Sequence, residues 1–126
     1  MLLDSLPHKC SIRRKQRQKV ALGGSKDVSI EELSDVSCWE QQASASEIRD
    51  YEKRGVSISR KVYFTEDLQL TERHVIVMTE RNGKAVAPQE LMDVMSEPRP
   101  DASAGLGVLY RVMVNTVPGV STVEGR

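Results

Sequence analysis

A short helix enclosed between two strands limits the possible folds of this chain more than any other feature. Ser44 and Glu47 have the S-x-x-E spacing of a capping box, in which each side chain satisfies a backbone N–H at the start of a helix. Apolar residues alternate on either side of this signal, over residues 36–42 and 56–64. This alternation predicts two strands. We therefore expect one helix, at about residues 44–54, between the second and third strands.

The other apolar stretches predict the rest of a mainly β domain. They add four strands to the two above, at residues 8–14, 74–79, 91–96 and 108–117. Short strands in this number, with one inserted helix, indicate a small six-stranded β-barrel or sandwich.

The polar stretches set the expected limits of this domain. Residues 15–35 show no sustained period and contain Gly23-Gly24, so we expect a long loop there. Residues 1–7 are expected to be a flexible leader and residues 118–126 a disordered tail. Residues 8–117 then form a single barrel domain.

Charge and hydropathy exclude several classes of protein. The chain has 18 basic and 18 acidic residues, whereas proteins that mainly grip phosphate backbones usually show a basic excess. No apolar run approaches the ~20 residues of a membrane span. The first residues lack the pattern of a signal peptide, so we expect a cytosolic protein with no membrane association.

The cysteines and histidines do not indicate a metal or cofactor site. Cys10 and Cys38 each alternate with apolar neighbours and are expected to be small buried side chains, with an inter-strand disulfide as the alternative. There is no C-x-x-C motif, and His8 and His74 lack ligand spacing. Neither histidine lies near a nucleophile in the sequence, so we expect hydrogen-bonded histidines at strand starts and no enzyme.

Charged residues cluster in two places that could form an assembly interface. The first is a stretch without acidic residues from His8 to Leu22, and the second is the helix. A solvated edge strand explains the basic stretch equally, because edge lysines guard against aggregation. The candidate interface residues are Arg13, Arg14, Lys15, Arg17 and Lys19 in the first group and Asp50, Lys53 and Arg54 in the second.

The order of these elements resembles that of the head-closure, or head–tail connector, proteins of tailed bacteriophages. The resemblance begins with a strand ending near Trp39, the helix SASEIRDYEKRG and the strand V-x-I-x-x-x-V-Y-F. It covers nearly the whole domain, from His8 to Val117, and lies in the order of elements more than in any one motif. Its further parts are residues 12–14, 22–24, 72–77, 82–84, 91–94, 101–107 and 108–115.

The resemblance implies a structural virion protein without catalytic residues or cofactors. Such a subunit is a small barrel with one inserted helix, assembled in the host cytoplasm into a ring of roughly six or twelve copies. The ring lies in the virion neck, with the portal or an adaptor protein above and the tail or tail-terminator protein below. It closes the filled head, provides the tail docking surface and lets DNA pass without binding it tightly.

Two other functions are compatible with the sequence. An adaptor or tail-completion ring of the same neck would differ in the neighbour that it contacts. A small single-stranded nucleic-acid-binding barrel would need aromatic side chains exposed on a strand face. The aromatic residues available for that purpose are Trp39, Tyr51, Tyr63, Phe64 and Tyr110.

Overall fold

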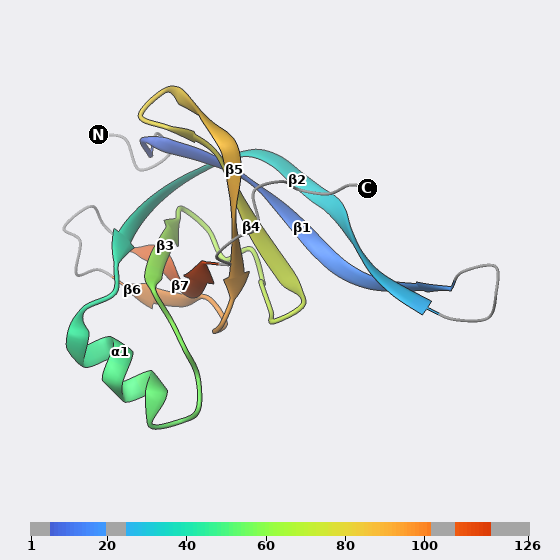
Figure 1. Cartoon of the computed structure of the whole chain (residues 1–126). Helices are drawn as coiled ribbons and strands as arrows, with labels where there is room; N and C mark the ends of the chain where they lie inside the picture. Colours follow the sequence, from blue (N-terminus) through green and yellow to red (C-terminus); the bar gives the residue numbers. More distant parts are fainter. Residues whose placement is uncertain (1–5, 20–24, 102–107, 117–126) are drawn as a thin grey trace.

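The structure, a computed structural model, describes residues 6–19, 25–101 and 108–116. It contains seven strands and one helix in the described part of the chain (Figure 1). In chain order these are β1 His8–Lys19, β2 Ser25–Gln42, α1 Ala45–Glu52, β3 Arg60–Phe64, β4 His74–Arg81, β5 Lys84–Val94, β6 Arg99–Asp101 and β7 Leu109–Thr116.

Six of the strands close into an antiparallel barrel. The sheet runs β3–β2–β1–β4–β5–β7, and β3 pairs with β7 to close the ring. This closing ladder runs from Arg60 opposite Val114 to Phe64 opposite Tyr110. The short strand β6 pairs with the start of β7 outside the ring of six. The expected mainly β fold is therefore confirmed, and the architecture is a barrel.

The barrel interior is filled by side chains from all six strands. The cluster contains both cysteines, each fully buried and free, so the predicted interior placement is confirmed and the disulfide alternative is not. A hydrogen bond with Cys38, together with burial, raises the pKa of the Cys10 thiol. The members are Cys10, Ile12, Cys38, Val62, Phe64, Leu70, Ile76, Met78, Met92, Val94, Val112 and Val114.

The predicted helix lies between β2 and β3 and begins at the predicted cap. The Ser44 N–H donates to Glu47 Oε1 at 2.8 Å, and the Glu47 N–H donates to Ser44 Oγ at 3.2 Å. After α1 the chain turns through Gly55, whose φ of +78° is easily adopted by glycine. Partial burial alone would raise the pKa of Glu47, but the Ser44 and Lys61 hydrogen bonds outweigh it and lower that pKa.

The helix is only partly buried. Its side chains Ile48 and Tyr51 are half-buried, and no residue of α1 is buried. The helix lies beside one end of the barrel (Figure 1). The interior is filled mainly by side chains of the strands, so the helix is not a layer of the core.

The expected long loop at residues 15–35 is the largest error of the sequence prediction. β1 continues to Lys19 and β2 starts at Ser25, so most of this segment is an antiparallel ladder. Its sequence is mainly polar, so it lacks the hydrophobic alternation by which half-buried strands are identified. Leu6, in the expected flexible leader, is buried. Residues 1–5 and 118–126 of the expected leader and tail lie outside the described residues.

Two other predicted strands have different limits. β3 begins at Arg60 and not at residue 56. β5 begins at Lys84 and continues through Pro88, whereas we expected it to start at residue 91. The β4–β5 register is irregular between Met78 and Glu80, opposite Pro88. Proline is tolerated at such irregularities because it lacks the N–H of a regular ladder.

Four charged side chains from four strands form a network at one end of the barrel. Arg81 on β4 donates two hydrogen bonds to Glu90 on β5, at 2.7 and 2.8 Å, and a third to Glu40 on β2. Arg60 Nη1 on β3 lies 3.0 Å from Glu40 and 3.7 Å from Glu90. Since β1 lies between β2 and β4 in the sheet, the network connects strands across the start of β1.

The electrostatics of the network favour its charged forms. Hydrogen bonds to Glu90 and Glu40 raise the pKa of Arg81, despite partial burial. The hydrogen bond from Arg81 outweighs desolvation and lowers the pKa of Glu90. The Glu40 side chain is only 10% exposed, and its carboxylate is ion-paired with both Arg60 and Arg81.

We predict that the helix depends on its cap. Ser44→Ala removes the acceptor for the Glu47 N–H and should lower the free energy of unfolding by about 1 kcal/mol. Urea unfolding followed by circular dichroism measures this loss. Ser57→Ala, at an exposed position outside the helix, is the control and should have little effect. An unchanged midpoint for Ser44→Ala would contradict the prediction.

We predict that the network stabilises the closed barrel. Arg81→Met removes three hydrogen bonds and leaves Glu40 with Arg60 alone, so the free energy of unfolding should fall by about 1–3 kcal/mol. The control is Arg99→Met, which removes an exposed arginine on β6. Equal stability of the two variants in urea would show that the network contributes nothing.

The lowered pKa of Glu90 predicts a pH dependence. Its folded-state pKa lies below the ordinary value of 4.5, so its contribution is fully present above that pH and is lost as pH falls through the folded-state value. Glu90→Gln should therefore destabilise the protein at pH 7, by less than about 1 kcal/mol because the side chain is partly exposed. As pH falls below the folded-state pKa, the variant and the unchanged protein should converge, and a difference that does not shrink in acid would contradict this assignment.

Candidate assembly interface

The hairpin of β1 and β2 extends beyond the barrel. β1 leaves β4 after Arg14, which is opposite His74, and the Lys15 N–H makes the last bond to that side, 2.7 Å from the Arg73 carbonyl. From there Lys15–Lys19 pairs only with Ser25–Ser29. We call these two segments the ribbon. Figure 1 shows the ribbon projecting away from the barrel.

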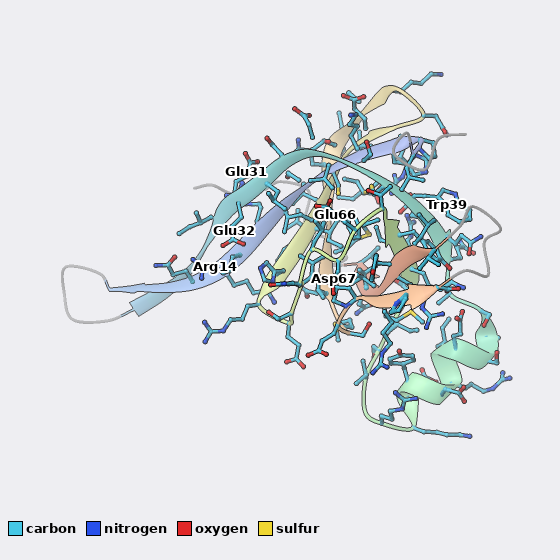
Figure 2. The ribbon with its side chains drawn as sticks, turned by 180° about the vertical axis from the view of Figure 1, so that it is seen from behind. Arg14, Glu31, Glu32, Trp39, Glu66 and Asp67 are labelled. Atoms are coloured by element: carbon cyan, nitrogen blue, oxygen red, sulfur yellow. The ribbon has the colours of Figure 1, made fainter. Side chains whose placement is uncertain are left out.

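Three of the predicted basic interface residues form ion pairs within the chain. Arg14 Nε lies 2.9 Å from Glu32, and Lys15 Nζ lies 3.3 Å from Asp93. Arg13 lies 4.0 Å from Glu31, on the same two strands. Figure 2 shows Arg14 and Glu32 close together on neighbouring strands. Exposed pairs of this kind contribute little to stability, but they fix how the strands present their charges.

The remaining predicted residues lie on two distant parts of the molecule. Arg17 and Lys19 lie on the ribbon, opposite Asp27 and Ser25. The helix residues Asp50, Lys53 and Arg54 are exposed, and the Arg54 guanidinium lies 4.8 Å from the centre of the Tyr51 ring. Both figures place the ribbon and the helix at opposite ends of the molecule. The structure therefore separates the predicted interface into two surfaces.

A third surface, along β2, was not found from the sequence. Ile30 and Leu33 are large apolar side chains with 43% and 42% of their surface exposed. Leu33 borders a groove of about 280 Å³ between β2 and the segment that follows β3. The groove is lined by Leu33, Val36, Ser37, Phe64, Thr65, Glu66 and Leu68. The sequence did not predict this groove because its two walls are distant in the chain. Leu33, in one of these walls, falls in the segment that was expected to be a loop.

Glu66 lines this groove, and other carboxylates lie on the neighbouring parts of the chain. Glu31, Glu32, Glu66 and Asp67 are exposed on the same side of the molecule in Figure 2, and Asp35 is exposed beside Val36. Glu31 and Glu32 face Arg13 and Arg14, as described above. Asp35 and Glu66 have no ion-pair partner within residues 6–19, 25–101 and 108–116. The rim of the groove is therefore acidic, in contrast to the basic sequence of the ribbon.

Both histidines are hydrogen-bonded at the starts of strands, as predicted. His8 Nδ1 accepts from the Asn82 N–H at 3.3 Å. His74 Nδ1 accepts from the Thr71 N–H at 3.0 Å, and its Nε2 lies 3.2 Å from Glu32 Oε1. Nδ1 of His74 is therefore the acceptor nitrogen, and Nε2 carries the proton that faces Glu32.

The described part of the chain contains neither a cluster of metal ligands nor a membrane-spanning helix. No group of three or more histidine, cysteine, aspartate or glutamate side chains there could hold a metal ion. The helix of that part is not long and apolar enough to cross a membrane.

The aromatic side chains do not form a stacking surface for single-stranded nucleic acid. Tyr63 and Phe64 are buried, and Trp39 lies against Tyr63 with ring centroids 5.0 Å apart. The Arg54 guanidinium lies over the Tyr51 ring. Tyr110 is half-buried. Single-stranded nucleic acids usually bind where several exposed rings can each receive a base, and this arrangement does not favour that function.

Comparison with known proteins supports the fold. No family model matches the chain, and no curated protein matches it. The structure is similar to the solution structure of protein SF1141 from Shigella flexneri 2a, with a TM-score of 0.65 and 9% sequence identity over 95% of this chain and 100% of that chain. At this identity the likeness concerns the fold alone.

Proposed function

We propose that this protein is a structural subunit of a phage neck, acting as a ring that closes the DNA-filled head and receives the tail. The observation that supports this proposal is the architecture itself. A closed barrel with one capped helix between β2 and β3 is the arrangement that the resemblance to head-closure proteins implies.

The distribution of charge supports assembly as the mode of action. The chain is neutral overall, yet its basic ribbon and the acidic rim of its groove lie on different surfaces. Complementary patches of this kind steer association and set its register. Repeated contacts between different surfaces of identical subunits close into a ring when the rotation permits it.

An adaptor or tail-completion ring in the same neck would use the same architecture. The two functions differ in the neighbouring protein, because a head-closure ring contacts the portal side and a tail-completion ring contacts the tail side. Crosslinking within purified particles, followed by mass spectrometry of the joined peptides, distinguishes them.

We predict that the chain is a stoichiometric component of purified phage particles. Mass spectrometry of gradient-purified virions should detect it, and electron microscopy of particles carrying a tagged chain should locate the tag between head and tail. Empty heads that have not packaged DNA are the control and should lack the chain. Its absence from infectious particles would refute the proposed function.

We also predict that acidic substitutions on the ribbon block assembly. Reversing Arg13 and Arg14 would place new carboxylates against Glu31 and Glu32 and disturb the hairpin itself. Gln16→Glu with Lys19→Glu avoids this problem, because these positions face Val28 and Ser25.

Particles made with this double variant should leak DNA or lack tails, with infectious titre reduced by more than about tenfold. Gln16→Lys with Lys19→Arg keeps the ribbon basic and serves as the matched control. Unfolding in urea should be similar for both variants. Normal titres with the acidic variant would leave the ribbon as a solvated edge with no role in assembly.

A further inference from the structure

The outer edge of β2 has no strand paired with it along most of its length. On one side β2 pairs with β1 from Cys38 to Ser25, and on the other side β3 reaches only Trp39–Gln42. In the described part of the chain, the side of β2 that faces away from β1 is therefore unpaired at Ser25–Cys38. We call this side the β2 edge. An unpaired edge presents backbone N–H and C=O groups that can accept another strand.

The β2 edge has features of a binding surface and not of a guarded edge. Ile30 and Leu33 expose apolar surface on it, and the groove beside Leu33 offers further apolar contacts from Val36 and Leu68. Exposed edges usually carry lysines or are covered, because they otherwise promote aggregation. From Ile30 to Val36 the charged residues of this edge are all acidic, and the carboxylates of Asp35 and Glu66 are unpaired in the described residues. A matching occupant is an extended, basic segment.

The chain itself contains such a segment. Beyond the Lys15 N–H bond to Arg73, β1 has no described strand on the side facing away from β2, so Gln16–Lys19 is a second free edge. The sequence Lys15–Lys19 contains three basic residues and no acidic one. At 3.3 Å per residue, the free stretch of β1 is about 13 Å long, well within the length of the β2 edge. The two free edges therefore have complementary charge.

These edges cannot pair within one molecule. They lie on opposite sides of the same hairpin, with the β1–β2 ladder between them. They can meet only when the ribbon of one copy lies along the β2 edge of another. Since the two surfaces differ, such a contact is head-to-tail and leaves a free ribbon and a free β2 edge for the next copies.

We propose that subunits join by strand addition, with the ribbon of one copy pairing through Gln16–Lys19 with the β2 edge of the next copy. The basic ribbon side chains then lie along the carboxylates around the groove, including Asp35 and Glu66. The inference deepens the proposed ring function by naming its subunit contact, and it rests on that function for its biological meaning. The strand contact itself is a property of the chain in solution.

Directed crosslinking tests this contact. One variant carries Gln16→Cys on the ribbon, and the other carries Ser34→Cys on the β2 edge; both positions are exposed. The native Cys10 and Cys38 have no exposed surface, so a short bismaleimide should react at the introduced thiols. The mixture should give crosslinked dimers well above either variant alone. Lys84→Cys, at the exposed first residue of β5, replaces the ribbon cysteine as the control for random collisions.

A charge exchange separates the contact from any effect on folding. Lys19→Glu is added to the ribbon variant, and Glu66→Lys is added to the edge variant. Each change alone should reduce the crosslinking yield by about tenfold, and the two together should restore it to within about threefold of the original. Restoration shows that both chains fold and that these two sites face each other.

Two results would overturn the proposal. One is a yield for the Gln16–Ser34 pair no greater than that of the Lys84 control. The other is a crosslinking yield that is not restored when Lys19→Glu and Glu66→Lys are combined. That result is expected if the β2 edge binds a basic segment of another protein.

The test also separates this inference from the proposed function. A chain found in the particle neck without the directed crosslink refutes strand addition alone. A chain that crosslinks in the predicted pattern but is absent from particles refutes the neck function and leaves strand addition in place.

Discussion

The pairing of β3 with β7 is the constraint on which the rest of the structure depends. It joins strands that are distant in sequence and turns an open sheet into a barrel. Closure protects both strands from edge-to-edge association and encloses the apolar cluster. It also leaves β2 longer than its neighbour β3, which covers only the last four residues of β2. The exposed β2 edge is thus a direct result of how the barrel closes.

The charged network complements this closure at one end of the barrel. The ion pair of Arg81 and Glu40 joins β4 and β2 beside the first residues of β1. No backbone ladder exists between β4 and β2, so side chains make this connection. Arginine suits this role because its planar group bonds two carboxylates at once. The apolar cluster supplies the driving force for folding, and the network fixes the relative positions of the strand ends.

The sequence predicted those elements whose signal is local. The helix position followed from Ser44 and Glu47, and strand β4, which is buried from Val75 to Met78, followed from its apolar run. The ribbon was not predicted because its residues are mostly polar. Its two segments are stabilised by pairing with each other, and no local period in the sequence indicates such pairing. The network and the groove were missed because each joins residues from several strands, and only the register brings these together. The sequence could name the basic candidate residues and the helix candidates, but only the fold showed that the two groups lie far apart.

The filled interior of the barrel constrains the ring that we propose. Residues such as Phe64 and Met92 occupy the space inside the six strands and have almost no exposed surface. Barrels of about this strand number enclose room for side chains and no aqueous channel. In a ring of these subunits, any duct would therefore run between copies along the symmetry axis. Its width would follow from how many copies close the ring, and its lining would come from the outer surfaces of the strands and loops.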